Sequence, residues 1–184
     1  DSSTSRGLGD VYKRQGLYRA SPGKMRRVVG EGQQDMVVRS VRYSARLNSL
    51  LVATQTNVGL LKADQHFVEL VDHKSLGQST VFDFYDRNNQ LWLGTDNGLL
   101  LYNFDDNSVS RPFKELASSA IRVVQPHAET GLWFGGAGGL YHYDGKTLQA
   151  APFNADLESG FVTVIETQGQ DLLVGTTSGL YWYQ

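Results

Sequence analysis

The stretch Leu91-Trp92-Leu93-Gly94-Thr95, followed by Asp96-Asn97-Gly98-Leu99, decides the fold. Leu91 to Leu93 are apolar at consecutive positions, so both faces of this strand are predicted to be buried. The Asn97-Gly98 pair permits the positive φ values of a tight hairpin turn, and Leu99 then begins a second apolar run. The stretch therefore predicts two antiparallel strands inside a sheet that is covered on both sides.

The same pattern recurs along the chain. Four segments share it: Leu50-Leu51-Val52-Ala53-Thr54, Leu91-Trp92-Leu93-Gly94-Thr95, Leu132-Trp133-Phe134-Gly135-Gly136 and Leu172-Leu173-Val174-Gly175-Thr176. A Gly-Leu pair follows each of them, at Gly59, Gly98, Gly139 and Gly179, and an earlier pair begins at Gly16. The glycines are separated by 43, 39, 41 and 40 residues. This period is typical of a four-stranded propeller blade, and it disfavours leucine-rich and helical-pair repeats.

Two further apolar runs complete each repeat. One precedes the Leu-Trp-Leu-Gly-Thr core, at residues 37–43, 80–85, 120–124 and 161–165. The other follows the Gly-Leu run, at residues 25–29, 67–71, 109–113 and 148–153. Four strands joined by short polar turns form an antiparallel up-and-down blade. The helical spacing of apolar residues between Phe113 and Ile121 predicts a helical turn in one link between blades.

The sequence thus predicts an all-β fold, a β-propeller arc of four-stranded antiparallel blades that is an incomplete propeller. Residues 1–15 are interpreted as a non-native, adapter-derived segment and are excluded from the fold. Residues 16–184 form the propeller: a partial blade at 16–29, blades at about 37–72, 79–113 and 120–153, and a partial blade at 161–184. In an alternative arrangement, the strand at residues 25–29 completes the last blade and closes a ring of four.

Composition excludes several classes of function. The chain has no cysteine, which rules out disulfides, thiolate nucleophiles and zinc sites built on thiolates. A net charge of −2 argues against a nucleic-acid partner, and no apolar run reaches the roughly 20 residues of a membrane helix. Charge is uneven, because residues 16–46 hold seven Lys or Arg against two Asp or Glu. Either a basic strand protecting a sheet edge or a patch for an anionic ligand explains this excess.

The motif Leu-Trp-x-Gly-Thr-x-x-Gly-Leu-x-x-Tyr resembles the two-component regulator propeller repeat of sensor regions in hybrid histidine kinases and diguanylate cyclases. The likeness spans residues 16–184 and is clearest over residues 86–102, where Asp86, Trp92, Gly94 and Gly98 match the repeat. The other repeats depart from it, since Ala45, His127 and Thr167 replace the Asp, and Leu51 and Leu173 replace the Trp. These motif residues are structural, so the resemblance carries over no catalytic site.

The resemblance implies a non-catalytic ligand-sensing or binding module of an extracytoplasmic receptor, on the periplasmic or extracellular side. A parent protein would carry the kinase or cyclase module and any membrane attachment. The expected partner is a small molecule, a glycan or a protein, and no cofactor is expected. Two rival hypotheses are a protein-interaction scaffold and a propeller enzyme such as a lyase or glycosidase, whose carboxylates or histidines should line the central channel.

Candidate ligand-binding residues lie in the turns between the second and third strands of the blades. They are Gln55, Thr56, Asn57, Thr95, Asp96, Asn97, Thr176, Thr177 and Ser178, and each turn is also adequate as a plain hairpin.

Other groups of chemically active residues receive structural interpretations. The pair Asp83 and Asp86 resembles a general acid and base, but we expect the two side chains to face opposite ways. The four histidines, at positions 66, 73, 127 and 142, lack the spacing of a shared face, so a metal site would need strands from different blades to converge. Asp105-Asp106-Asn107 is interpreted as a turn and not as a calcium loop. No catalytic or metal-binding residue is predicted.

Overall fold

The structure is a computed structural model, and it describes residues 17–28, 37–62, 64, 66–127, 131–157, 160–169 and 171–183. The segment that we interpreted as adapter-derived, residues 1–15, lies outside the described residues. The regular secondary structure of the described residues is β-strand, apart from two short 3₁₀ turns.

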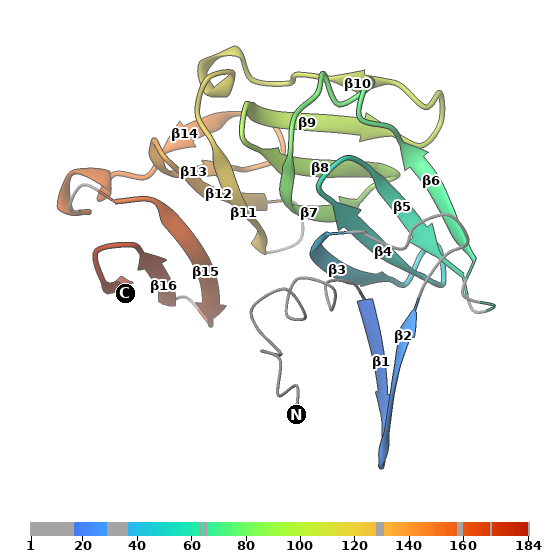
Figure 1. The fold of residues 1–184 in the computed structure, drawn as a ribbon. Coiled ribbons are helices and arrows are strands. Elements are labelled where there is room, and N and C mark those ends of the chain that lie inside the picture. Colours follow the sequence, from blue (N-terminus) through green and yellow to red (C-terminus); the bar gives the residue numbers. More distant parts are fainter. Residues whose placement is uncertain are drawn as a thin grey trace, which may run out of the picture.

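The strands form successive antiparallel sheets in which sheet order follows chain order (Figure 1). A hairpin of β1 (Leu17–Ser21) and β2 (Lys24–Val28) comes first. The first four-stranded sheet comprises β3 (Val38–Ser44), β4 (Ser49–Thr54), β5 (Val58–Leu61) and β6 (Phe67–Val71). The second comprises β7 (Val81–Arg87), β8 (Gln90–Thr95), β9 (Gly98–Asn103) and β10 (Val109–Ser110). The third comprises β11 (Ile121–His127), β12 (Gly131–Gly136), β13 (Gly139–Tyr143) and β14 (Leu148–Ala150). The last described sheet has three strands, β15 (Val162–Gln168), β16 (Asp171–Thr176) and β17 (Leu180–Tyr183).

These sheets are the blades of a β-propeller arc, as predicted. The first strand of each blade is the innermost one, because β3 contacts β7, β7 contacts β11, and β11 contacts β15. In Figure 1 the β3 blade and the β15 blade lie at opposite ends of the arc. The alternative of a closed ring of four is wrong, since β2 pairs with β1 and not with the last blade.

Alternate residues of each second strand pack toward opposite neighbours. Leu91 and Leu93 belong to a core cluster shared with the first blade, which includes Leu51 and Ala53. Trp92 points the other way, and its ring lies 5.8 Å from the Phe134 ring of the third blade. All five residues from Leu91 to Thr95 are buried, so the prediction of a strand covered on both faces is confirmed.

The small fourth residue of the pattern allows neighbouring blades to approach closely. A Cβ at Gly94 would lie 2.8 Å from the backbone oxygen of Ile121, on the inner strand of the next blade. At Gly135 a Cβ would meet the side chain of Val162 in the same way. The space left by the absent side chain is therefore filled by the following blade, as expected for a glycine in a strand interior.

The turn of the first repeat differs from the sequence alignment. We aligned Gly59 with the turn glycines, which made this turn two residues longer than the others. The structure instead closes it between Thr54 and Asn57, with Thr54 N donating to Asn57 O at 2.8 Å. Thr176 N and Gly179 O form the same bond at 2.8 Å in the last blade. Asn57 therefore occupies the position of Gly179, and all the turns have the same length.

The helical turn predicted between Phe113 and Ile121 is confirmed, as the short 3₁₀ turn η1 (Lys114–Leu116). Leu116 is fully buried and packs with Trp92, Leu99 and Ile121, so the link closes the core between the second and third blades. A second 3₁₀ turn, η2 (Asn154–Asp156), precedes the last blade.

A buried carboxylate joins three successive blades. Asp83, on the inner strand of the second blade, accepts hydrogen bonds from Ser40 Oγ at 3.0 Å and from Arg42 Nη2 at 2.9 Å. It also accepts a bond from the backbone N of Val124 at 3.0 Å. One side chain thus fixes the inner strands of the first and third blades against the second.

We predict that Asp83→Ala lowers the free energy of unfolding by about 2–4 kcal/mol, because the Arg42 guanidinium and the Val124 N–H lose their acceptor. Chemical denaturation monitored by circular dichroism measures the change. The double variant Arg42→Met with Asp83→Met removes both charges and should recover part of the loss. A cost below about 0.5 kcal/mol for Asp83→Ala would show that the carboxylate does not hold the blades together.

Candidate functional site

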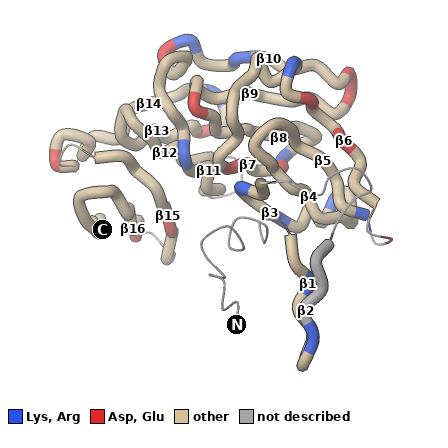
Figure 2. The backbone as a smooth tube through the Cα atoms, in the orientation of Figure 1, with Lys and Arg blue, Asp and Glu red and all other residues tan. Residues whose placement is uncertain are grey.

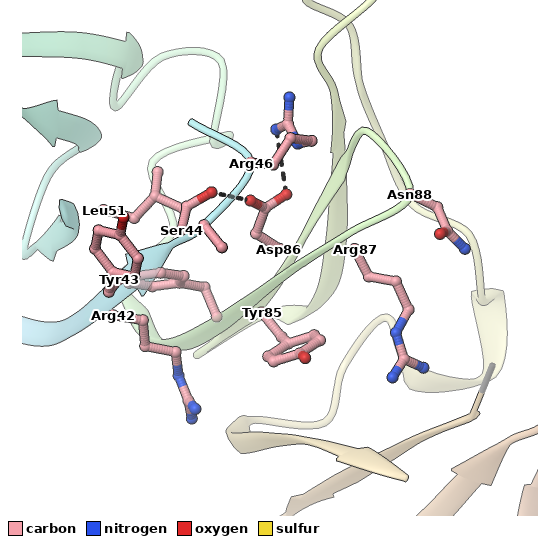
Figure 3. A pocket seen from close by; sticks show the side chains of 11 residues that line it. Arg42, Tyr43, Ser44, Arg46, Leu51, Tyr85, Asp86, Arg87 and Asn88 are labelled. Carbon is pink, nitrogen blue, oxygen red and sulfur yellow. Dashed lines mark hydrogen bonds and ion pairs between the residues drawn. The ribbon is translucent and has the colours of Figure 1, made fainter. Parts of the chain in front are cut away.

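A pocket of about 260 Å³ lies between the first and second blades (Figure 3). It is on the side of the blades that carries the turns between their first and second strands. It is lined from β3 and the following turn on one side and from the end of β7 on the other. Its lining residues are Arg42, Tyr43, Ser44, Ala45, Arg46, Leu51, Phe84, Tyr85, Asp86, Arg87 and Asn88.

Asp86 is anchored at one wall of the pocket by residues of the first blade. Its carboxylate accepts hydrogen bonds from Ser44 Oγ and, at 3.2 Å, from Arg46 Nη2 (Figure 3). The Arg46 guanidinium also lies 4.1 Å from the centre of the Phe104 ring, an arrangement that favours a cation. The Asp86 position is thereby fixed before any ligand arrives.

The register of β7 is regular from Asp83 to Asp86, which agrees with the expectation that the two residues lie on opposite faces of the strand. Both carboxylates bind side chains of the first blade, Asp83 through Arg42 and Asp86 through Arg46. Phe84 packs toward the first blade on the same face as Asp86, whereas Tyr85 packs toward the third blade, which Asp83 also reaches through Val124 N. Each carboxylate is engaged by an arginine, so the pair serves as anchoring acceptors between blades.

Arginine dominates the charge of the pocket. The described lining residues include Arg42, Arg46 and Arg87, and Asp86 is the one acid among them. The guanidinium of Arg87 lies 5.5 Å from the centre of the Tyr85 ring, and Arg87 also donates to the backbone oxygen of Gly131 in the third blade. Guanidinium groups bind carboxylates through paired hydrogen bonds, and tyrosine rings supply a flat apolar surface. The arrangement suits a small polar ligand that carries negative charge.

The predicted ligand-binding residues lie at the opposite end of the strands. The three predicted turns follow β4, β8 and β16, whereas the pocket lies where β4 and β8 begin. A six-residue strand separates the two ends by about 20 Å. The third blade stands between the turn at 95–97 and the turn at 176–178, so the structure does not bring all nine residues together.

Most of the described polar contacts of these turns are internal to their own blade. Thr95 Oγ1 donates to Gly98 O at 2.7 Å, and Thr176 Oγ1 donates to Gly179 O at 3.1 Å. Asp96 Oδ1 accepts from Thr80 N at 2.9 Å. Asn57 Nδ2 donates to Glu69 Oε2 at 2.7 Å. These side chains stabilise the hairpins, and Thr95 is fully buried.

Two of the four histidines meet within the third blade. The rings of His127 on β11 and His142 on β13 lie 5.1 Å apart, and Trp133 lies 4.5 Å from His142. His142 Nε2 and Trp133 Nε1 are buried without hydrogen-bond partners. Within the described part of the chain, no third His, Cys, Asp or Glu joins them to form a metal-binding group.

The pocket residues were missed because their roles depend on pairing between blades. A signal for them exists in the period: Ser44 and Asp86 are 42 residues apart, and Arg42 and Asp83 are 41 apart. Polar residues separated by one repeat lie on adjacent blades, and complementary types at that separation predict a contact. The basic excess in residues 16–46 was a second signal, since it includes Arg42 and Arg46.

Comparison with known proteins supports the fold. No family model matches the chain, and no curated protein matches it. Solved structures do match: the extracellular domain of the one-component system BT4673 from B. thetaiotaomicron aligns with a TM-score of 0.71 at 17% identity, over 92% of this chain and 24% of that chain. The extracellular domain of the hybrid two-component system BT3049 from the same organism aligns with a TM-score of 0.65 at 16% identity, over 79% of this chain and 20% of that chain. The computationally designed Ika4 protein aligns with a TM-score of 0.61 at 16% identity, over 84% of this chain and 94% of that chain.

These similarities establish the fold. The chain spans about a quarter of the length of the BT4673 domain that it matches. In the described residues, no helix has the length and apolar character needed to cross a membrane.

The histidine pair generates a prediction about pH. Burial lowers the pKa of His142 below its usual value of 6.5, the charge of His127 lowers it further, and Asp144 acts in the opposite direction. The folded state thus disfavours the protonated imidazole, so stability is greatest above the unfolded pKa and is lost as the pH falls below it. We expect the unfolding temperature of the wild type to fall more steeply between about pH 7 and pH 5 than that of His142→Leu.

The variant is a suitable comparison because Leu101 occupies the equivalent position in the second blade: Leu101 pairs with Trp92, as His142 pairs with Trp133. Thermal melts at each pH provide the measurement. Parallel pH dependence in the two proteins would contradict the assignment of acid sensitivity to His142.

Proposed function

We propose that the chain is a non-catalytic ligand-binding module of a sensor propeller, acting in an extracytoplasmic receptor. The repeat motif supports this proposal, as does the similarity of the fold to extracellular domains of one-component and hybrid two-component systems. The effector module and the periplasmic or extracellular location belong to the same proposal, since they rest on resemblance.

The observation that carries the proposal is the pocket between the first two blades. At about 260 Å³ it lies just below the roughly 300–1,000 Å³ that is typical of ligand sites, which limits the ligand to a molecule no larger than a monosaccharide. Its position between blades means that a ligand contacts two repeats at once. A ligand held there favours one spacing of the blades, which is a way for binding to bias a conformation.

We infer the chemistry of the ligand from the lining residues. Arg42 is paired with Asp83, and Arg46 with Asp86, so the arginine positions are fixed before binding. Arg87 is the third arginine of the lining, held against the Tyr85 ring and the backbone oxygen of Gly131. The ligand class that matches this site is a small hydroxyl-bearing molecule with a carboxylate, such as a hexuronic acid.

The turns predicted from the sequence remain the second candidate position. Arg111 donates a hydrogen bond to the backbone oxygen of Asn97, which brings a cation to the turn after β8. A ligand at that end of the blades would depend on Arg111 and not on Arg46.

Titration of the protein with glucuronate, followed by nuclear magnetic resonance or calorimetry, tests the proposal. We expect glucuronate to bind at least about tenfold more tightly than glucose, which has the same size and hydroxyl groups but no carboxylate. Arg46→Met keeps an apolar chain over Phe104 and removes the charge, so it should weaken glucuronate binding roughly fivefold or more.

Arg111→Met is the matched control, because it removes one exposed arginine at the opposite end of the blades. It should leave glucuronate binding unchanged. Loss of binding in Arg111→Met with normal binding in Arg46→Met would move the site to the turns. Equal affinity for glucose and glucuronate, or no binding of either at about 10 mM, would contradict the proposed ligand class.

A further inference from the structure

Each inner strand carries a bulge at the same place. On β11 the pairing register shifts between Ile121 and Val123, and it shifts at the corresponding place on β3, β7 and β15. A bulge leaves one residue without a partner and redirects its side chain. The four bulge residues, which are separated by 43, 40 and 41 residues, are Arg39, Phe82, Arg122 and Thr163.

The neighbours of Arg122 show where its side chain points. Ile121 packs in the core between the second and third blades, and Val123 packs in the core between the third and fourth. Both are buried, whereas Arg122 is exposed. Arg122 therefore projects into neither interface but from the inner edge of the arc, the edge formed by the innermost strands β3, β7, β11 and β15. Figure 2 shows the basic position on β11, an interior strand of the arc.

Two aromatic rings hold the guanidinium in place. Arg122 Cζ lies 4.9 Å from the centre of the Phe82 ring, on β7, and 5.1 Å from the centre of the Phe161 ring, just before β15. One ring thus comes from the preceding blade and the other from the entry to the following blade. Contact of a cation with aromatic rings is favourable, so the orientation of the guanidinium is set before a ligand arrives.

The charge of Arg122 is not balanced by an acid. Arg42 and Arg46 are each paired with an aspartate, but no Asp or Glu among the described residues forms an ion pair with Arg122. The N–H donors of a guanidinium lie in its plane and match the two oxygens of a carboxylate. Arg122 is therefore a fixed cation whose hydrogen-bonding edge is available.

We propose that Arg122, Phe82 and Phe161 form a binding site for a small aromatic carboxylate on the inner edge of the arc. The carboxylate accepts paired hydrogen bonds from the guanidinium, and the flat body of the ligand packs against the phenylalanine rings. None of the three residues lines the pocket between the first and second blades, so this is a second site and does not rest on the function proposed for that pocket.

Titration of the purified chain with benzoate, followed by nuclear magnetic resonance, tests the proposal. We expect benzoate to bind at least about fivefold more tightly than acetate, which has the carboxylate without the ring, and than benzamide, which has the ring without the charge. Equal affinity for benzoate and either comparison ligand, or no binding of benzoate at about 20 mM, would overturn the proposal.

The positions of the shifted resonances locate the ligand. The largest changes should occur at the backbone amides of Phe82, Arg122 and Phe161. Changes centred instead on the residues that line the pocket between the first and second blades would overturn the proposal.

Three variants separate the charge from the ring. Arg122→Met keeps an unbranched apolar stem beside the rings and removes the charge, so it should weaken benzoate binding roughly fivefold or more. Arg122→Lys keeps the charge but cannot form the paired hydrogen bonds, so it should recover only part of the affinity. Phe82→Leu should weaken benzoate binding about threefold and leave acetate binding unchanged, and it provides the test if Arg122→Met fails to fold.

Lys114→Met is the matched control, because it removes one exposed cation from the link that leads to the third blade. It should leave benzoate binding unchanged. Equal weakening in Lys114→Met and Arg122→Met would show a general effect of charge and overturn the proposal. Arg122→Met with wild-type benzoate affinity and a lower free energy of unfolding would also overturn it, since Arg122 would then only hold the blades together.

Discussion

The rest of the structure depends on a missing side chain at one position in the second strand of each blade. Gly94 and Gly135 have no Cβ, and the inner strand of the following blade occupies that space. The apolar residues that precede the glycine then contact the blades on both sides of their own, which explains why Leu91, Trp92 and Leu93 are all buried. A blade of this kind covers both faces only when it has a blade on each side, as in repeat proteins whose stability comes from interfaces between neighbours.

Polar contacts add specificity to this apolar packing, and they are concentrated at one interface. Between the first and second blades, Asp83 and Asp86 each bind an arginine of the first blade, Arg42 on β3 and Arg46 in the turn that follows it. The Asp83 carboxylate also reaches the third blade through Val124 N. A charged group buried in this way stabilises the fold only if its hydrogen bonds are complete. Asp83 meets this condition, because both of its carboxylate oxygens accept hydrogen bonds. Asp86, Arg42 and Arg46 also line the pocket, so the interface that holds the blades in register presents the arginines for binding.

The period of the sequence predicts the fold class, the strand order within a blade and the buried central strands, because these follow from local pattern and repetition. It places the turn of the first repeat wrongly, since Gly59 marks no turn and Asn57 takes the glycine position. The pocket was not predicted, because Ser44, Arg46 and Asp86 are remote in sequence and meet only when two blades pack. The contact of His127 with His142 depends on strand register, which spacing along one strand does not reveal.

The most direct test of the central claim compares Gly→Ala substitutions at equivalent positions of three blades. The account predicts that Gly94→Ala costs about 2 kcal/mol or more in free energy of unfolding, because its Cβ would meet the Ile121 backbone at 2.8 Å. Gly135→Ala should also be costly, since its Cβ would meet Val162, which is β-branched and fully buried. Gly175→Ala should change stability by less than about 0.5 kcal/mol, because an added Cβ there would make only ordinary contact with Val164. Equal costs at the three positions would contradict the claim that the following blade, and not the glycine's own strand, requires the small residue.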